Sequence, residues 1–329
     1  MGPQRKSKKM TATTLTRRKD FLSVMDFDAA DFERCLELAA EVKADRSLGR
    51  HAPTAEALNG RHVAMLFDKL SLRTRTTFEI AVRELGGHVV TVQVDVALGV
   101  REPVSDVARN LERWVDAVII RTFSQRALEE FAAAARRLHV VNALTDEEHP
   151  CQAIADFLTL QEHWGALGGR TIAFVGDGNN VATSLAHAAA MLGVNLHVAS
   201  PEGYQLPHSV VQQATSVSRH GARLCLFSEA ADAVAGVDAI YADTWTSMGR
   251  ESERDARRVA FAPYQVNEAL MALANPGALF MHCLPVHRGE EVTAEVFESA
   301  AAVVFDQAEN RLHGQKALLL MLLAPGFSG

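Results

Sequence analysis

Two arginines and four hydroxyl side chains crowd into one short stretch, FDKLSLRTRTTFE (residues 67–79). An apolar, strand-like run precedes it, and Phe78 and Val82 then recur at helical spacing. Thr76 and Glu79 have the spacing of a capping box. A strand, a polar turn and a helix start would direct free backbone N–H groups and guanidinium groups at one place. This indicates an anion site, with phosphate as the first candidate, although ordinary capping with exposed arginines fits the stretch equally well.

Further polar or reactive residues follow other predicted strands along the chain. They are Arg121, His149, Gln152, Asn180, Asp243, Cys283 and, at the start of the last helix, Arg311. Each residue alone has a structural explanation. Arg121 could be an arginine whose hydrogen bonds are all made within the protein, His149 could be a helix cap, and Cys283 could be a small core residue. Because the carboxyl ends of the strands in parallel α/β sheets face one cleft, the whole set predicts a single functional site.

The elements that must position these residues alternate between strands and helices. Predicted strands cover residues 61–67, 86–93, 116–123, 138–144, 170–176, 195–200, 238–243, 278–284 and 301–306. Further helices are predicted over residues 31–45, 104–115, 125–137, 149–167, 181–193 and, as an amphipathic helix, 310–324. This alternation predicts an α/β fold with two doubly wound parallel-sheet domains joined by interdomain helices, dividing near His149.

Composition narrows the class of protein. The 329 residues are 48% hydrophobic and 22% charged, which is typical of globular proteins, and no apolar run reaches the roughly 18 residues of a membrane span. The net charge of −7 argues against a nucleic-acid partner. Seven bases and no acid in residues 1–19 predict a disordered basic tail, and Met10 is an alternative start. Four cysteines without paired spacing suggest neither disulfides nor a zinc site, so a reducing, cytoplasmic location fits best.

The motif VGDGNN raises a competing hypothesis, a nicotinamide dinucleotide site. Gly176 and Gly178 follow a strand and precede a helix, as that fingerprint requires. Its third glycine would fall at Val181, and the next strand carries no acid at the ribose position, since Glu202 comes only after a proline. The incomplete fingerprint argues against this cofactor.

Seven segments carry a resemblance to a known family: SLRTRTTFE, RTF, HPCQAIADFLTLQE, GDGNN, DTWTSMG, MHCLPVHRGEEVT and FDQAENRLHGQKALL. In this order and spacing, from Asp20 to Leu323, the chain resembles the aspartate/ornithine transcarbamylases. The resemblance implies a carbamoyl-phosphate domain over residues 20–148, completed by a C-terminal helix over 311–329, and an ornithine domain over 149–310. It implies carbamoyl transfer from carbamoyl phosphate to the δ-amine of L-ornithine, giving L-citrulline and phosphate in arginine metabolism. It further implies a homotrimer, or a multiple of trimers, with shared active sites, no metal and no organic cofactor.

The resemblance also assigns the carbamoyl-phosphate site. It implies that the phosphate is held by Ser71, Leu72, Arg73 and Thr74, the carbonyl oxygen by Arg121 and His149, and the amide by Gln152. Leu284 through its backbone, Cys283 and Arg311 complete this pocket, and Pro150 and Cys151 belong to the same set. Arg73, Arg121, His149, Gln152, Cys283 and Arg311 form the implied catalytic group. These donors would polarise the carbonyl and stabilise the phosphate as it leaves.

The acceptor half follows from DTWTSMG and GDGNN. The resemblance implies that Asp243, Ser247 and the Met248 backbone hold the α-amino group of ornithine, and that Asn180 orients its amino-acid end. The δ-amine must lose a proton before it attacks, because an alkylammonium with a pKa near 10 is not a nucleophile at neutral pH. Cys283 beside Asp243 is one possible aid to this proton loss.

Three positions depart from the family pattern. Leu70 and Leu72 replace a proline and a threonine that are common in relatives, which is a mild change. Ala97 stands where a glutamine or histidine is expected to reach the carbamoyl phosphate of a neighbouring subunit, and Arg101 is a possible substitute. Two alternatives therefore remain open: a transferase for another amine, such as putrescine or N-acetylornithine, and a catalytically weak anion-binding paralogue.

Overall fold

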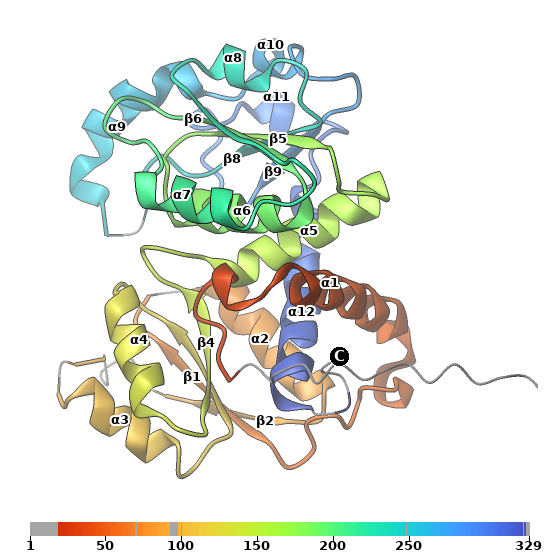
Figure 1. Ribbon diagram of the computed structural model, residues 1–329, viewed down its shortest axis with the longest axis vertical. Coiled ribbons are helices and arrows are strands. Elements are labelled where there is room, and N and C mark those ends of the chain that lie inside the picture. Colours follow the sequence, from red (N-terminus) through yellow and green to blue (C-terminus); the bar gives the residue numbers. More distant parts are fainter. Residues whose placement is uncertain are drawn as a thin grey trace, which may run out of the picture.

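The computed structural model describes residues 19–69, 71–92, 98–99, 101–247, 249–324 and 326. Over these residues the chain forms two α/β domains, with helix α5 (Pro150–Trp164) lying between them (Figure 1). Every strand pairing within the two sheets is parallel. The predicted fold class, two doubly wound parallel sheets joined by helices, is confirmed.

The first domain is built on a four-stranded sheet in the order β2-β1-β3-β4. Its strands are β1 (His62–Phe67), β2 (His88–Thr91), β3 (Ala117–Arg121) and β4 (His139–Leu144). Its helices are α1 (Ala29–Ala44), α2 (Leu72–Glu84), α3 (Val104–Leu111) and α4 (Gln125–Ala134), with short 3-10 turns at Val24–Asp26 and Asp45–His51. Val63 and Met65 of β1 belong to the core formed with α1 and α2, whereas Ala64 and Leu66 belong to the core formed with α3 and α4. Both faces of the sheet are therefore covered, as the near-continuous apolar strands require.

The second domain has a five-stranded sheet in the order β7-β6-β5-β8-β9. Its strands are β5 (Thr171–Val175), β6 (Asn195–Ala199), β7 (Leu224–Phe227), β8 (Ala239–Ala242) and β9 (Leu279–His282). Its helices are α6 (Asn180–Leu192), α7 (His208–Ser216), α8 (Ala230–Val234), α9 (Arg254–Phe261), α10 (Glu268–Met271) and α11 (Ala294–Phe297), with 3-10 turns at Glu251–Glu253 and Ala262–Tyr264. The strand order reverses between β1 and β3 in the first sheet and between β5 and β8 in the second, where such folds bind ligands.

The last helix, α12 (Val304–Leu323), differs from the prediction. The strand expected over 301–306 is wrong, because only Ala302 forms an isolated bridge, to Phe280, and the helix has begun by Val304. A short apolar run such as AAVVF fits a buried helix as well as a buried strand. The expected start of the C-terminal helix at 311 is therefore also wrong.

Helix α12 is also not amphipathic, because it is buried nearly all round where it packs against α1, α2 and α5. It returns from the second domain to the first (Figure 1). At Gly314 an added Cβ would lie 2.8 Å from Cγ2 of Ile154, so only glycine permits this close approach to α5. No helix in the described part of the chain is long and apolar enough to cross a membrane.

Helix α2 starts earlier than the capping-box spacing suggested. Ser71 is its N-cap, with an extended backbone and a side-chain oxygen that accepts from the Thr74 N–H at 3.2 Å. The helix therefore begins at Leu72, and the predicted capping box of Thr76 and Glu79 is wrong because both lie inside the helix. Ser71 is the N-cap instead of Thr76, because it is the first residue whose side-chain oxygen can accept from an unpaired backbone N–H group of the helix.

The predicted disordered tail included Lys19, and at this residue the prediction is wrong. Its Nζ donates to the carbonyl oxygens of Ala132, Ala135 and Leu138 at 3.0–3.3 Å, around the end of α4, and pairs with Asp20 at 2.7 Å. A cation is favourable at a helix C-terminus, where carbonyl oxygens lack N–H partners. Residues 1–18 lie outside the described part of the chain.

Candidate active site

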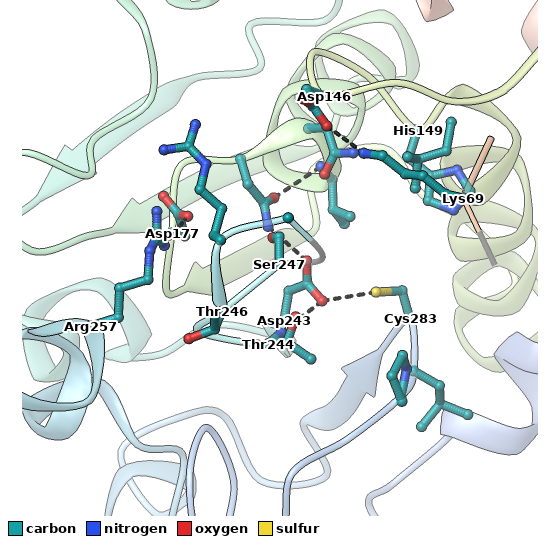
Figure 2. Close-up of a pocket in the computed structure, with 18 of the residues that line it drawn as sticks. Lys69, Asp146, His149, Asp177, Asp243, Thr244, Thr246, Ser247, Arg257 and Cys283 are labelled. Carbon is teal, nitrogen blue, oxygen red and sulfur yellow. Dashed lines mark hydrogen bonds and ion pairs between the residues drawn. The ribbon is translucent and has the colours of Figure 1, made fainter. Parts of the chain in front are cut away.

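One cavity of about 800 Å³ gathers residues that follow strands of both sheets. Twelve of the predicted site residues line it: Ser71, Leu72, Arg73, Thr74, Arg121, His149, Asn180, Asp243, Ser247, Cys283, Leu284 and Arg311. They come from both domains, at and near the two points where strand order reverses. The fold thus brings the predicted donor half and acceptor half of the site to one space (Figure 2).

Three predicted residues lie behind the cavity wall. Pro150 opens helix α5, and Cys151 is buried, with its thiol donating to the carbonyl of Asn142 at 3.3 Å. Gln152 is also buried, and its amide contacts other side chains instead of the cavity. Residue Met248 lies outside the described residues.

The predicted anion site lies at the N-terminus of α2. The first N–H groups of a helix have no partner within the helix, and here they belong to Leu72, Arg73 and Thr74. All three residues line the cavity, and the Ser71 hydroxyl covers only the N–H of Thr74. Free N–H groups, the positive end of the helix dipole and the Arg73 guanidinium therefore form an anion-binding site.

Two further arginines, Arg121 and Arg311, are buried in the cavity wall without a counter-charge. No described carboxylate forms an ion pair with either, and the Nε atom of each has no hydrogen-bond partner. Burial, together with the charges of Arg311 and Arg73, lowers the pKa of Arg121 to about 10. Burial likewise lowers the pKa of Arg311. Buried cations without a partner are costly, so this wall is arranged for an anionic ligand.

His149 adds an uncharged group to the same wall. Burial holds the pKa of its ring well below the usual value, and the nearby charges of Arg311, Arg121 and Lys69 act in the same direction. Its Nδ1 has no partner within the described structure, and its backbone N–H donates to Oγ of Ser184 at 2.9 Å. The imidazole is therefore neutral and available to hydrogen-bond a ligand atom.

Lys69 lines the cavity but was not predicted from the sequence, although it lies within the segment FDKLSLRTRTTFE. Its side chain is 4% exposed, and Nζ pairs with Asp146 at 2.5 Å and lies 4.0 Å from the centroid of the Phe123 ring. Figure 2 shows this pair beside His149. The signal in the sequence was a lysine two residues before the N-cap serine, but its partner Asp146 follows a different strand.

The acceptor half is organised around Asp243, directly after β8. Its Oδ2 accepts from Nδ2 of Asn179 at 2.7 Å, and its Oδ1 accepts from the Thr244 N–H at 2.8 Å. Asn179 caps α6, and it is this residue, one before the predicted Asn180, that contacts Asp243. The side chain of Asn180 instead donates to the carbonyl of Thr145 at 2.5 Å.

Gly178 explains the tight loop that presents Asn179. A Cβ there would lie 2.4 Å from the backbone nitrogen of Leu206, so any side chain would collide with the neighbouring segment. The incomplete dinucleotide motif thus serves close backbone packing and the cap of α6.

The Cys283 thiol faces Asp243 from the end of β9 and donates to its Oδ1 at 3.0 Å (Figure 2). Burial raises the pKa of this thiol, and the charge of Asp243 and the hydrogen bond to it raise the pKa further. A protonated thiol cannot take a proton from an amine, which argues against the predicted role of Cys283 in proton loss. The next residue, Leu284, has φ of 61°, a strained conformation that is found mainly at functional sites.

Arg257 fixes the loop that follows Asp243. It is buried, with Nη1 contacting Oδ2 of Asp177 at 2.6 Å and the Trp245 carbonyl at 2.9 Å. Burial raises the pKa of Asp177, whereas the bond to Arg257 lowers it. This ion pair was not anticipated from the sequence, and it positions the backbone near Ser247 on the cavity wall.

Two groups of described residues have side chains of metal-ligating type close together: Asp243, His282 and Cys283, and His287, Glu290 and Glu291. Several of these side chains already have protein partners, such as Cys283 with Asp243 and Glu290 with Arg254. Nε2 of His282 bonds Glu291 at 3.1 Å, and its Nδ1 accepts from the Leu284 N–H at 2.9 Å. The His282 ring therefore serves as a brace for the turn after β9.

Comparisons with known proteins agree with this geometry. The family profile described as aspartate/ornithine carbamoyltransferase, carbamoyl-P binding domain, matches residues 19–162, and the profile of the Asp/Orn binding domain matches residues 168–322. A protein named ornithine carbamoyltransferase from Anoxybacillus flavithermus is 45% identical over 317 residues, covering 95% of this chain and 99% of the relative. A relative of the same name from Symbiobacterium thermophilum is 45% identical, covering 94% of this chain and 100% of its own length.

Solved structures agree as well. The ornithine carbamoyltransferase of Pyrococcus furiosus superposes with a TM-score of 0.89 at 42% identity, covering 94% of this chain and 98% of that one. The enzyme of the same name from Thermus thermophilus gives a TM-score of 0.83 at 41% identity, covering 93% and 99%. With both domain profiles matched across nearly the whole chain, and with the site residues gathered in one cavity, the chain belongs to the aspartate/ornithine carbamoyltransferase family.

Proposed function

We propose that this protein transfers the carbamoyl group of carbamoyl phosphate to the δ-amine of L-ornithine, giving L-citrulline and phosphate. The observation that carries the proposal is the pair of buried arginines, Arg121 and Arg311, that share a cavity with Arg73 and have no carboxylate partner. A dianionic phosphate attached to a neutral carbamoyl group supplies the missing negative charge and a carbonyl oxygen for the neutral donor His149.

The phosphate binds at the N-terminus of α2. The N–H groups of Leu72 and Arg73 and the Arg73 guanidinium converge there, and Lys69 adds a second cation nearby. Charge-assisted hydrogen bonds of this kind are roughly twice as strong as neutral ones. The same contacts stabilise the leaving group as negative charge grows on it.

The carbamoyl group then faces Arg121, His149 and Arg311. These groups donate hydrogen bonds to its oxygen, polarise the carbonyl and stabilise the oxyanion of the tetrahedral intermediate. Donors that are already in place need no reorganisation during the reaction, which is why such sites are effective. Gln152 acts from behind the wall through its contact with Arg311 at 2.6 Å.

Ornithine binds on the opposite wall. Asp243 accepts from the α-ammonium group, while Ser247 and Asn180 contact the amino-acid end. The δ-amine, once deprotonated, attacks the carbonyl carbon through its lone pair and forms the new C–N bond. Collapse of the intermediate breaks the C–O bond, whose electron pair leaves with phosphate, and the nitrogen releases its remaining extra proton.

We also propose a homotrimer with shared active sites in the cytoplasm. Leu72 supports this assembly, because its side chain is 79% exposed at the very rim of the anion site. A large apolar side chain in this position is suited to cover by a neighbouring subunit. Sedimentation equilibrium would test the assembly, and a monomer that retains full activity would reject shared sites.

A citrulline assay tests the activity. Ornithine, N-acetylornithine, putrescine and aspartate should be supplied as competing acceptors with carbamoyl phosphate, and products resolved by mass spectrometry. Citrulline should dominate. Carbamoylation of another amine would reassign the substrate, and absence of any product would favour an anion-binding protein without catalysis.

A further inference from the structure

Asp156 is a buried carboxyl group that the proposed reaction does not use directly. It lies on α5 one turn after Gln152 and is 1% exposed, in the interior between the two domains. It does not line the cavity and forms no ion pair with a described residue. A buried acid in this position requires an explanation, because burying an unpaired charge is costly.

One oxygen of Asp156 receives all of its hydrogen bonds. Oδ1 accepts from Nε2 of Gln152 at 2.8 Å, from Nε2 of Gln307 at 2.6 Å and from the hydroxyl of Tyr241 at 3.4 Å, while Oδ2 has no partner. Gln307 is on α12 and Tyr241 on β8. A single atom thus joins both interdomain helices to the sheet of the second domain.

These bonds determine which way two amide groups face. A glutamine amide has a donor end and an acceptor end, and a carboxylate accepts only. Asp156 therefore attracts the NH₂ ends of Gln152 and Gln307, and their carbonyl oxygens must point away from it. Without the carboxylate, the NH₂ end of Gln152 would lose its acceptor, and that of Gln307 would keep only the Tyr241 hydroxyl at 3.0 Å.

The two outward oxygens reach the two halves of the active site. Oε1 of Gln152 accepts from Nη1 of Arg311 at 2.6 Å. Nη2 of the same arginine donates to Oγ1 of Thr74, in the anion site, at 2.5 Å. Oε1 of Gln307 accepts from the backbone N–H of His282 at 3.0 Å, directly before Cys283. Asp156 is therefore the common acceptor of two hydrogen-bond chains, one through Gln152 to Arg311 and one through Gln307 to His282.

We propose that Asp156 is a positioning residue for carbamoyl transfer, which orients Arg311 in the donor half through Gln152 and the β9 end in the acceptor half through Gln307. This inference rests on the proposed function. If either amide turned over, an NH₂ group would face the guanidinium of Arg311 or the N–H of His282. Donor would then oppose donor, and both groups would be displaced from the reacting atoms.

The electrostatics of the site agree with this role. Burial raises the pKa of Asp156 to about 7, against the hydrogen bonds from Gln152, Gln307 and Tyr241 and the charge of Arg311, which lower it. The other ionisable groups around it are Arg311, which stays protonated, and Tyr241 and Cys283, whose pKa values are raised by burial. Asp156 is therefore the member of this set that changes charge between pH 6 and pH 8.

The first test compares Asp156→Leu with Thr159→Val as its matched control. Thr159 is equally buried on α5 and also joins α12, accepting from Nδ2 of Asn310 at 2.9 Å, but its bonds lead away from the cavity. With folding verified by circular dichroism and thermal melting, Asp156→Leu should lower kcat about 100-fold, the cost of a small misplacement of reacting groups. Thr159→Val should leave kcat near the wild-type value. Equal kcat losses in both variants, or an unchanged kcat in Asp156→Leu, would overturn the inference.

The second test uses Asp156→Asn, which keeps an acceptor oxygen and the side-chain shape but not the charge. It should recover much of the activity lost in Asp156→Leu, and it remains informative if the leucine variant does not fold. The ratio of wild-type kcat to Asp156→Asn kcat should fall severalfold from pH 8 to pH 6, as the wild type takes up its proton. Titration of ornithine and of groups that both proteins share cancels in this ratio, so a constant ratio would reject the role of the carboxylate. Failure of the wild type to form citrulline would instead reject the proposed function.

Discussion

The thiol of Cys283 donates a hydrogen bond to Oδ1 of Asp243 over 3.0 Å, joining the ends of neighbouring strands β9 and β8. Together with Asn179 and the Thr244 N–H, it gives this carboxylate three donors. The carboxylate is therefore held in one orientation before any ligand arrives. In this role the cysteine acts as a hydrogen-bond donor and not as a base.

Cys283 should accordingly tolerate serine better than alanine. Serine keeps a donor toward Asp243, whereas alanine removes it, so Cys283→Ala should raise KM for ornithine by about tenfold, matching a lost bond to a charged group of roughly 1.5 kcal/mol. Steady-state kinetics of both variants at saturating carbamoyl phosphate provide the measurement. Equal KM values for the two variants would show that the donor is not what the site needs.

Replacement of Arg73 by alanine should nearly abolish turnover without unfolding the protein. Its charge serves the anion site, and one lost charge-assisted contact of about 1.5–3 kcal/mol predicts at least a tenfold fall in kcat/KM. Arg83→Ala is the matched control, because Arg83 lies on the same helix but pairs with Glu79 at the surface. An Arg73→Ala variant with more than about a tenth of the wild-type rate would mean that the anion site is misassigned.

Ornithine should be preferred strongly over putrescine, which has no α-carbon substituents. The hydrogen bonds from Asp243 and Ser247 to the α-amino group would then be lost at about 1–3 kcal/mol each, so discrimination of roughly 30-fold to more than 10,000-fold is expected. The ratio of kcat/KM for the two acceptors measures it. The ratio should shrink in Asp243→Asn, and equal turnover of both acceptors by the wild type would contradict the assignment.

His313 should make folding less favourable in mild acid. Burial lowers the pKa of its ring to about 4, with the charges of Lys43, Arg46 and Lys316 acting in the same direction, and neither ring nitrogen has a hydrogen-bond partner. As pH falls through about 6.5 the unfolded chain binds a proton that the folded chain binds only near pH 4, so stability is lost over this window.

The predicted slope is at most about 1.4 kcal/mol per pH unit for this single group. Urea unfolding between pH 4.5 and pH 7 should therefore show a flatter pH dependence for His313→Leu than for the wild type. His51→Leu, at an exposed histidine, should keep the wild-type slope. Identical slopes for all three proteins would refute the prediction.

Arg101 remains a candidate for the contact that Ala97 cannot make. Its side chain is exposed and lies outside the cavity of its own chain, as a residue serving a neighbour would. Ala97 itself is outside the described residues. Arg101→Ala should raise KM for carbamoyl phosphate by about tenfold or more, since a charge-assisted bond of roughly 1.5 kcal/mol or above is lost. Ala97→Gln in that background should restore part of the affinity.

Arg109→Ala offers a matched control, because Arg109 is exposed on α3 and pairs only with Asp106 among the described residues. Its KM for carbamoyl phosphate should equal that of the wild type. If Arg101→Ala also leaves KM unchanged, nothing compensates for Ala97 and the weak-paralogue hypothesis gains support.

The helices and strands could be predicted where apolar residues form a regular pattern or an uninterrupted run. Buried strands such as β1 and β3 read as apolar runs bounded by polar turns. Strand β7 was missed because it lies at a sheet edge and is partly exposed, which leaves only the short run LCLF. The start of α12 was misplaced because VVF can be buried equally well in either kind of element.

The site could be predicted where residues follow strand ends, because topology alone brings those ends together. The contribution of Lys69 could not be predicted, because it depends on an ion pair with Asp146, which follows a different strand. The same limit explains Asn179: adjacent asparagines are equivalent in the sequence, and the cap of α6 decides which one meets Asp243. Gln152 was placed in the pocket because nothing in the sequence reveals that Arg311 and Asp156 occupy its amide.

Helix α12 has a consequence for the order in which the protein can be made. The ribosome completes β1 to β4 of the first domain before it begins the second, yet the core of that first domain includes Leu318, Leu319 and Leu320 packed beside α1 and α2. The domain that is translated first must therefore be finished last. During synthesis the apolar face of the first domain stays exposed until α12 leaves the ribosome and covers it. This is the interval in which a chaperone would protect most apolar surface.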